Sequence, residues 1–202
     1  IGIFVGKSLT PNKKDEGKRL LNKLQEEKNI NDYQFILQKC PSCGKKMGIV
    51  ENELCGLHES QGSVRFRCYG DCAYSDSDLP IYVIDEDLYE NTPSLVIGTV
   101  DKFALLPFFV NMRRLFGVDV PELNQQTPPT LIIQDELHLI SGPLGSMVGH
   151  YEGVFHSLMS DGLSKPKIIT STATIAMARE QIRDLYGVGP EKVKIFPPPG
   201  IK

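Results

Sequence analysis

The sequence predicts an α/β fold, in which a parallel sheet with flanking helices carries a small cysteine-rich insertion. Short apolar runs typical of buried strands alternate with stretches of helical periodicity, an order that favours a parallel sheet. The segment 40–78 interrupts this order, because it is rich in Gly and Cys and poor in long apolar runs. Hydrophobic residues make up 41% of the 202 positions and charged residues 23%, as in soluble globular domains that bury a core.

The expected elements follow the chain in order. A first strand, Ile3–Val5, leads into a helix that has Thr10 as its N-cap and Pro11 at its first position, and that runs to about Lys28. Later strands are expected at 81–84, 95–98, 131–133 and 167–170. Later helices are expected over 144–158 and 175–185, where apolar residues recur on one face. Helices therefore lie between and after the strands.

Charge is distributed unevenly. The net charge of −3 is too small to indicate a nucleic-acid or membrane partner by itself. Residues 1–47 hold ten Lys and Arg against five Asp and Glu, which suits either a segment near phosphates or a solvated helix face. The longest apolar run, 103–110, is far shorter than the ~20 residues of a membrane span, and no signal peptide is visible. We expect a cytoplasmic protein without a membrane partner, and, because the chain begins at Ile1, further sequence upstream.

Two pairs of cysteines have the spacing of metal ligands. Cys40 and Cys43 form a Cys-x-x-Cys knuckle followed by Gly, and Cys68 and Cys72 form a second, slightly wider pair. A knuckle turns two thiolates toward one ion, and a second pair completes a tetrahedral Cys₄ site. The sequence therefore predicts a zinc ribbon over 40–78 with a structural Zn²⁺.

The strands of this ribbon are expected at Lys45–Val50 and Ser63–Cys68, with Val64, Phe66 and Ile49 as a small core. Cys55 and His58 are spare candidates for the metal. The alternative is a set of unligated cysteines in a reducing cell. A redox pair is disfavoured because the motif does not open a helix after a strand, and a catalytic zinc is disfavoured because four Cys leave no position for water.

A second group of polar residues follows the later strands. Asp135 and Glu136 come directly after the strand 131–133, at the edge where ligands bind in parallel sheets. Asp135 can hold Mg²⁺ on nucleotide phosphates, and Glu136 can orient or deprotonate an attacking water. The hydroxyl residues of Ser171–Thr174 follow the strand 167–170 and can bond the carboxylate of a neighbouring strand end. The alternatives are a capping pair at Asp135 and Glu136, and an N-cap role for Thr174.

These motifs together resemble those of superfamily-two helicases and translocases. Asp135-Glu-Leu-His138 looks like their Asp-Glu-x-His motif, Thr172-Ala-Thr174 like their Ser/Thr-Ala-Thr motif, and Thr99–Phe103 like the segment that touches the nucleic-acid backbone. More narrowly, 135–151, the four-cysteine insertion and the run from Ala173 to Gly187 resemble the helicase-like component of the DISARM anti-phage defence system.

The resemblance implies a RecA-like core over 1–39 and 79–202, into which the ribbon 40–78 is inserted. It implies an ATP-dependent motor on nucleic acid, DNA more than RNA, with other defence-system proteins as further partners. Asp135 would bind Mg²⁺ and Glu136 would position water. The resemblance also assigns roles outside this pair: His138, Thr172 and Thr174 would couple hydrolysis to movement, and Thr99 and Lys102 would contact nucleic acid.

One part of such a motor is not found. The segment Gly2–Ser8 is one residue short of Gly-x-x-x-x-Gly-Lys-Ser/Thr, and its strand would lie inside the motif. We therefore expect the phosphate-binding loop upstream, a second RecA-like domain downstream, and no ATPase activity in these 202 residues alone. The competing hypothesis is a non-catalytic zinc module that binds nucleic acid or a partner protein.

Overall fold

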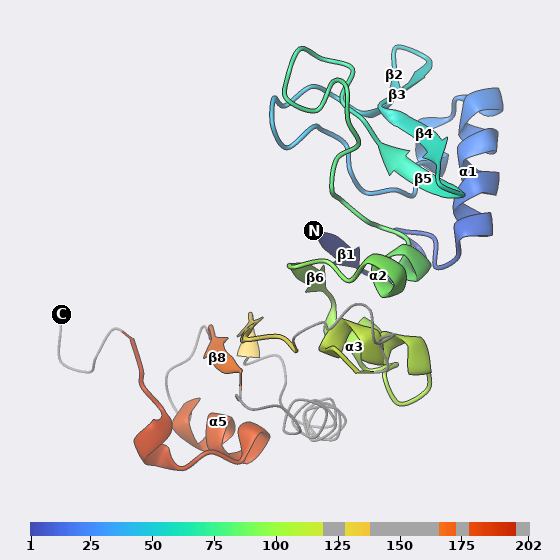
Figure 1. Cartoon of the computed structure of the whole chain (residues 1–202). Helices are drawn as coiled ribbons and strands as arrows, with labels where there is room; N and C mark the ends of the chain where they lie inside the picture. The colour runs from blue at the N-terminus through green and yellow to red at the C-terminus, as the bar shows by residue number, and fades with distance from the viewer. Residues whose placement is uncertain (119–127, 138–165, 173–177, 197–202) are drawn as a thin grey trace. The chain divides into compact units, whose positions relative to one another are not determined.

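The computed structural model describes residues 1–118, 128–137, 166–172 and 178–196. It divides the chain into two compact units, Ile1–Leu105 and Leu106–Lys202 (Figure 1). Each unit combines helical segments with a pair of parallel strands, so the predicted α/β class is confirmed. Within the described ranges no helix is both long and apolar enough to cross a membrane.

The first unit begins with a parallel pair of strands. β1 (Gly2–Phe4) pairs with β6 (Val96–Gly98) in the register Ile3 to Ile97. The expected strand at 81–84 is reduced to one bridge, in which Tyr82 exchanges backbone hydrogen bonds of 2.8 and 2.9 Å with the β1 segment. The reason is local: Pro80 precedes this segment, and α2 (Asp85–Asn91) begins directly after Ile84.

The long helix α1 spans Lys14–Glu27, so the expected start at Thr10 is wrong. Glu16 explains the later start, because its carboxylate accepts the backbone N–H groups of Asn12 and Lys13 and so caps the helix there. Lys28, with φ of 52°, ends the helix in the left-handed region. The short 3₁₀ turn η1 (Ile30–Asp32) follows, and α3 (Val100–Phe103) comes after β6.

The cysteine-rich segment folds as two successive hairpins. β2 (Gly48–Val50) pairs with β3 (Glu53–Cys55), and β4 (Leu57–Ser60) pairs with β5 (Ser63–Phe66), all antiparallel. The expected single hairpin of 45–50 with 63–68 is therefore wrong.

The two turns give the physical reason. Glu51 and Asn52 have φ of 51° and 63°, and Gln61 and Gly62 have φ of 52° and 71°. Two successive left-handed residues make the tight turn that matches the twist of a hairpin, so each strand pairs with its immediate neighbour in sequence.

Helix α1 packs on this cysteine-rich segment. Leu21 and Leu24 of α1 belong to one buried cluster with Val64 and Phe66 of β5, whose burial confirms that part of the predicted ribbon core. Gly17 lets α1 approach the neighbouring Ile84, which belongs to the same cluster, since a Cβ on Gly17 would lie 2.5 Å from that side chain. The core of the ribbon is thus continuous with α1, and the domain boundaries at 39/40 and 78/79 stay a prediction.

A buried ion pair ties the second hairpin to α2. Asp87, 1% exposed, accepts hydrogen bonds from Ser63 at 2.5 Å and from the guanidinium of Arg65 at 3.1 Å. The second guanidinium nitrogen of Arg65 lies 2.9 Å from the other Asp87 oxygen, so both carboxylate oxygens are close to the guanidinium group. Such a pair fixes the orientation of β5 against α2, because both groups lose their charge partner if either element shifts.

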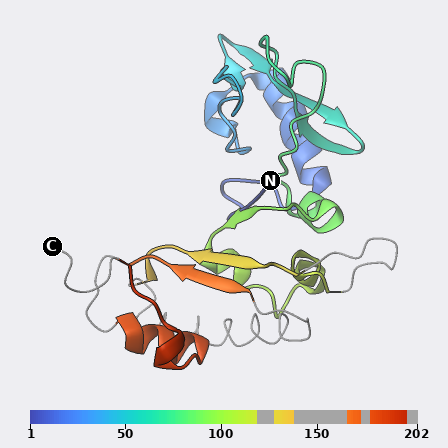
Figure 2. The same ribbon diagram turned by 60° about the vertical axis from the view of Figure 1, so that its left-hand side comes forward.

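The second unit contains the other parallel pair. β7 (Leu131–Gln134) and β8 (Lys167–Thr170) lie side by side in register (Figure 2), as their sequences predict. The expected helix at 175–185 is described from Ala178 as α5 (Ala178–Tyr186). The 3₁₀ segments η2 (Val110–Phe116) and η4 (Pro190–Lys192) complete the described elements. The helix expected over 144–158 lies outside the described residues.

Candidate functional site

The structure brings the four predicted cysteine ligands together. The sulfur atoms of Cys40, Cys43, Cys68 and Cys72 all lie within 4.8 Å of one another, and those of Cys43 and Cys68 are 3.5 Å apart. Four sulfurs held about 2.3 Å from one tetrahedral ion would lie about 3.8 Å apart. The cluster therefore fits a metal ion such as zinc, with a donor set made of thiols alone.

The backbone around the cysteines is shaped by two tight turns. In the first, the N–H of Gly44, whose φ is 75°, donates to the carbonyl of Cys40 at 2.8 Å. In the second, the N–H groups of Gly70 and Tyr74 lie 3.2 and 3.4 Å from the sulfurs of Cys68 and Cys72. N–H groups directed at sulfur stabilise thiolates, the form in which cysteine binds metals.

Burial and backbone N–H groups act on the pKa values of the thiols in opposite directions. Burial raises the pKa of Cys40, but hydrogen bonds from the backbone N–H groups of Cys43 and Ser42 outweigh it and lower this pKa to about 7. The Gly70 N–H lowers the pKa of Cys68, but burial and the neighbouring thiols raise it to about 12. Because neighbouring thiolates repel one another, four thiols this close cannot all be ionised without a cation between them. The arrangement therefore suits a divalent cation that offsets their charge.

The two spare candidates lie outside this cluster. Cys55 pairs with Gly48 in the first hairpin. The Nε2 atom of His58 lies 3.1 Å from an oxygen of Asp78. Among the described residues, the group that could hold a metal ion is therefore the four cysteines that the spacing predicted.

The carboxylate site lies where β7 and β8 end. The hydroxyl of Ser171, directly after β8, donates to Oδ1 of Asp135, directly after β7. The backbone of both segments continues this pairing, since the N–H of Leu137 donates to the carbonyl of Ser171 at 2.9 Å. The structure thus confirms that a hydroxyl residue of one strand end bonds the carboxylate of the next. The residue is Ser171, the first hydroxyl residue of the predicted segment Ser171–Thr174, whereas the family resemblance assigned roles only to Thr172 and Thr174.

Asp135 and Glu136 are both exposed at this edge. The hydrogen bonds from Ser171 and from the Glu136 N–H, which is 3.0 Å from Oδ1, lower the pKa of Asp135, so this carboxyl group is ionised at neutral pH. Glu136 itself has φ of 54°, a left-handed conformation that non-glycine residues rarely adopt and that is often found at functional sites.

Residues on both sides hold this edge in place. Leu137, which follows Glu136, is fully buried, and its carbonyl accepts a hydrogen bond of 2.9 Å from Gln181 of α5. The hydroxyl of Tyr186, at the end of α5, donates to the Gln134 side chain. Thr172 is half-buried beside Ser171, whereas His138 and Thr174 lie outside the described residues.

The proposed nucleic-acid residues lie at the end of β6 in the first unit. Thr99 is exposed, and its N–H donates to the carbonyl of Phe4 at 3.1 Å. Lys102 is only 5% exposed, and its ammonium group lies 2.6 Å from Asp85 and 2.8 Å from Asn12. Burial raises the pKa of Asp85 to about 6, although Lys102 acts in the opposite direction. The Lys102 ammonium thus points inward, and its role toward nucleic acid stays a prediction.

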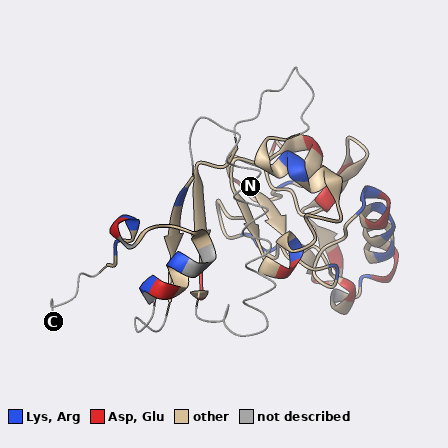
Figure 3. Ribbon diagram, turned by 90° about the horizontal axis from the view of Figure 1, so that it is seen from below, with Lys and Arg blue, Asp and Glu red and all other residues tan. Residues whose placement is uncertain are grey.

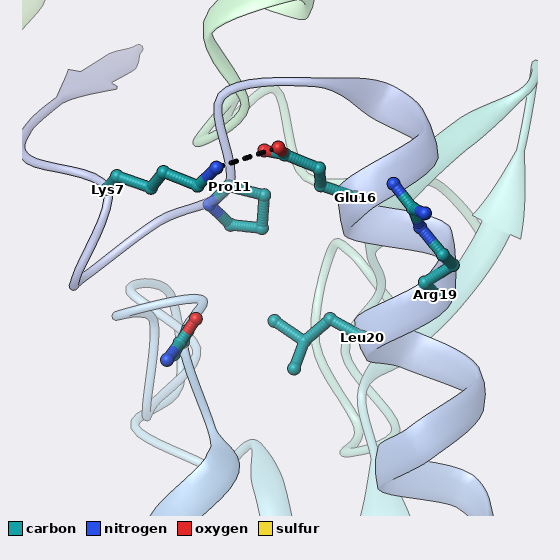
Figure 4. A pocket seen from close by; sticks show the side chains of 6 residues that line it. Lys7, Pro11, Glu16, Arg19 and Leu20 are labelled. Carbon is teal, nitrogen blue, oxygen red and sulfur yellow. Dashed lines mark hydrogen bonds and ion pairs between the residues drawn. The ribbon is translucent and has the colours of Figure 1, made fainter.

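Lys7, from the Gly6-Lys7-Ser8 segment, lines a pocket of about 240 Å³ together with residues of α1 (Figure 4). Lys7 pairs with Glu16 of α1 at 2.8 Å, as the dashed line in Figure 4 marks. In a phosphate-binding loop the Lys opens the following helix, whereas α1 begins only at Lys14. This geometry differs from that of a phosphate-binding loop.

No family model matches the chain. The chain is similar along its whole length to the DISARM protein DrmA of Bacillus paralicheniformis, with 33% identity over 238 residues. It spans about a fifth of the length of this curated relative, 21%. The chain therefore matches only a part of DrmA.

Proposed function

We propose that the chain is part of an ATP-dependent motor in a DISARM anti-phage defence system, a helicase or translocase that acts on nucleic acid, with DNA preferred to RNA. The observation that carries this proposal is the edge of the β7–β8 pair, where Asp135 and Glu136 lie beside Ser171 and Thr172. The similarity to a DISARM protein over the whole chain supports the link to defence.

The side chains at this edge have the chemistry that nucleotide hydrolysis needs. Asp135 is ionised, and the hydrogen bonds from Ser171 and from the Glu136 N–H both engage Oδ1, so within the described residues its other oxygen is available for Mg²⁺. Mg²⁺ neutralises charge on the phosphates when nucleotide is bound. In this proposal Glu136 orients the attacking water and accepts its proton, and Thr172, with His138 and Thr174, couples hydrolysis to movement.

We propose that the segment from Thr99 to Lys102 contacts the nucleic-acid backbone. Thr99 is exposed at the strand end. Lys102 contributes by holding the segment, because its inward ammonium group joins α3 to Asn12 and to Asp85 of α2. The metal of the cysteine cluster is proposed to be structural Zn²⁺, since a closed set of four thiols suits zinc and leaves no site for a substrate.

The experiment compares the longer protein that contains this chain with its Glu136→Gln variant. This substitution keeps the size of the side chain but removes the group that accepts a proton. ATP hydrolysis in the presence of DNA should fall at least about a hundredfold, while ATP binding is retained. The control is Glu180→Gln, which removes an exposed carboxylate from α5 and should leave hydrolysis unchanged. Equal hydrolysis by the wild type and by Glu136→Gln would overturn the proposal.

The complete cysteine cluster favours a second candidate, a non-catalytic module that binds nucleic acid or a partner protein through the metal centre. The same experiment separates the two. A wild-type protein that binds DNA but hydrolyses no ATP would favour the module, whereas hydrolysis that depends on Glu136 would favour the motor.

A further inference from the structure

Most basic side chains of the first unit are neutralised by neighbours. Lys and Arg alternate with Asp and Glu along α1 (Figure 3). Lys7 pairs with Glu16, Lys18 with Asp15 at 2.9 Å, and Lys23 lies 3.1 Å from Asp32. The excess of basic residues in 1–47 therefore does not produce a uniformly basic helix face.

The three lysines around the first cysteine knuckle differ from these. Lys39, Lys45 and Lys46 are all exposed, and in the part of the chain that the structure describes none of them forms an ion pair. Lys39 and Lys46 are partners in an antiparallel bridge between the segments that enter and leave the knuckle. We call these three residues the knuckle lysines.

An exposed aromatic ring lies beside them. Tyr69 stands in the second cysteine pair and is 44% exposed. The ammonium group of Lys45 lies 5.1 Å from the centre of its ring. The stem of Lys45 packs on Gly70, where a Cβ would lie 3.4 Å from Lys45 Cβ. Both knuckles of the metal centre therefore contribute to one basic and aromatic surface.

The charges around this surface decide what kind of ligand it suits. Zinc with four thiolates carries a net charge of about −2, and Asp71 and Glu51 add two carboxylates nearby on the chain. The three lysines do not outweigh this sum, so the surface has no strong long-range field. A ligand must be held by direct contacts, anionic groups on the ammonium groups and a flat ring on Tyr69.

We infer that the knuckle lysines and Tyr69 bind single-stranded nucleic acid, with phosphates on the ammonium groups and a base stacked on the ring. Single strands combine these two groups at short intervals and expose their bases for stacking, whereas a duplex hides them. This inference rests on the proposed function for its choice of nucleic acid as the partner. It places a contact on the cysteine-rich segment, in addition to the segment at Thr99.

The test measures binding of the zinc-loaded 202-residue chain to a fluorescent oligothymidine by anisotropy, without nucleotide, across a range of salt. The Lys45→Ala/Lys46→Ala variant removes two phosphate contacts, so the slope of log affinity against log salt should become shallower by about 1.4. Tyr69→Leu should weaken binding roughly five- to a hundredfold with little change in that slope. A duplex of the same length should bind more weakly than the single strand.

The control is Lys13→Ala/Lys28→Ala, which removes two exposed lysines at the ends of α1 and should leave affinity and slope unchanged. Zinc content is measured for every variant and should stay at one ion per chain. Loss of zinc in Lys45→Ala/Lys46→Ala would mean that the lysines serve the thiolates, and would overturn the inference. Equal losses in the control, unchanged binding in both test variants, or duplex bound as tightly would also overturn it.

Failure here is distinguishable from failure of the proposed motor, because this assay contains no ATP and leaves Glu136 intact. A chain that does not bind the single strand refutes the knuckle surface alone. A longer protein that hydrolyses no ATP, or whose hydrolysis is unchanged in Glu136→Gln, refutes the motor alone.

Discussion

The left-handed backbone of Glu136 predicts that, at this position, a glycine variant is more stable than an alanine variant. Its φ of 54° costs an L-residue about 1–2 kcal/mol. Glycine avoids this penalty but loses about 0.5–1 kcal/mol more backbone entropy on folding than alanine. The balance favours Glu136→Gly over Glu136→Ala by about 0.5–1 kcal/mol, which is opposite in sign to the ordinary effect of glycine.

The comparison of Gly with Ala isolates the backbone. Both variants lose whatever the Glu136 carboxylate contacts, and both keep the N–H that donates to Asp135 at 3.0 Å. Thermal unfolding followed by circular dichroism should show a midpoint about 2–8 °C higher for Gly, given roughly 4–8 °C per kcal/mol in a unit of this size. Both variants should lack hydrolysis in the longer protein, so Glu136→Gly should be the more stable of two equally inactive variants.

The matched control is the same pair of substitutions at Glu180, an exposed position in α5. There Gly should be less stable than Ala by about 1 kcal/mol, because the residue lies in a helix. If Gly is also the less stable residue at position 136, by a similar margin, the left-handed conformation is refuted, and with it the view that strain is concentrated at this carboxylate.

Two further predictions concern the first unit. Metal analysis should find one tightly bound zinc per chain, and Cys43→Ser should lose it; less than about half an equivalent in the wild type would contradict the Cys₄ site. Chelation should expose the amides of 40–78 to hydrogen exchange before those of the β7–β8 pair, because metal binding contributes directly to folding in small modules. Asp85 has a folded-state pKa of about 6, above its ordinary value of 3.8, so the folded state binds more protons between these values and its contribution to stability falls as pH rises from 4 to 6. Urea unfolding should show that the stability of the wild type relative to Asp85→Asn decreases over this interval, and an increase would show that the pairing with Lys102 outweighs burial.

Local spacing was sufficient to predict much of the candidate site. Two cysteine pairs, each held by its own tight turn, specify a four-sulfur cluster whatever strands connect them. Likewise, apolar runs that end in carboxylates and hydroxyls place those groups at one edge when the strands pair in parallel, as Asp135 and Ser171 do. In both cases the chemistry lies within a few residues of the element that positions it.

Pairing within the ribbon depended on backbone conformation that composition did not reveal. The left-handed residues at 51–52 and 61–62 divide the segment into two hairpins. Asn52 and Gly62, at the second positions of these turns, are residue types that favour such turns. Glu51 and Gln61, at the first positions, are residue types that rarely adopt a left-handed conformation.

Only the tertiary structure decided which charged groups are free. Lys102 looks like a surface lysine in sequence, yet it is buried against Asn12, 90 residues earlier in the chain, and against Asp85. Lys45, in contrast, remains exposed without a carboxylate partner among the described residues. The reason is that a charged side chain is buried only where packing brings it a partner, here from a distant part of the chain. The residues next to Lys102 in the sequence do not indicate which distant residue that partner is.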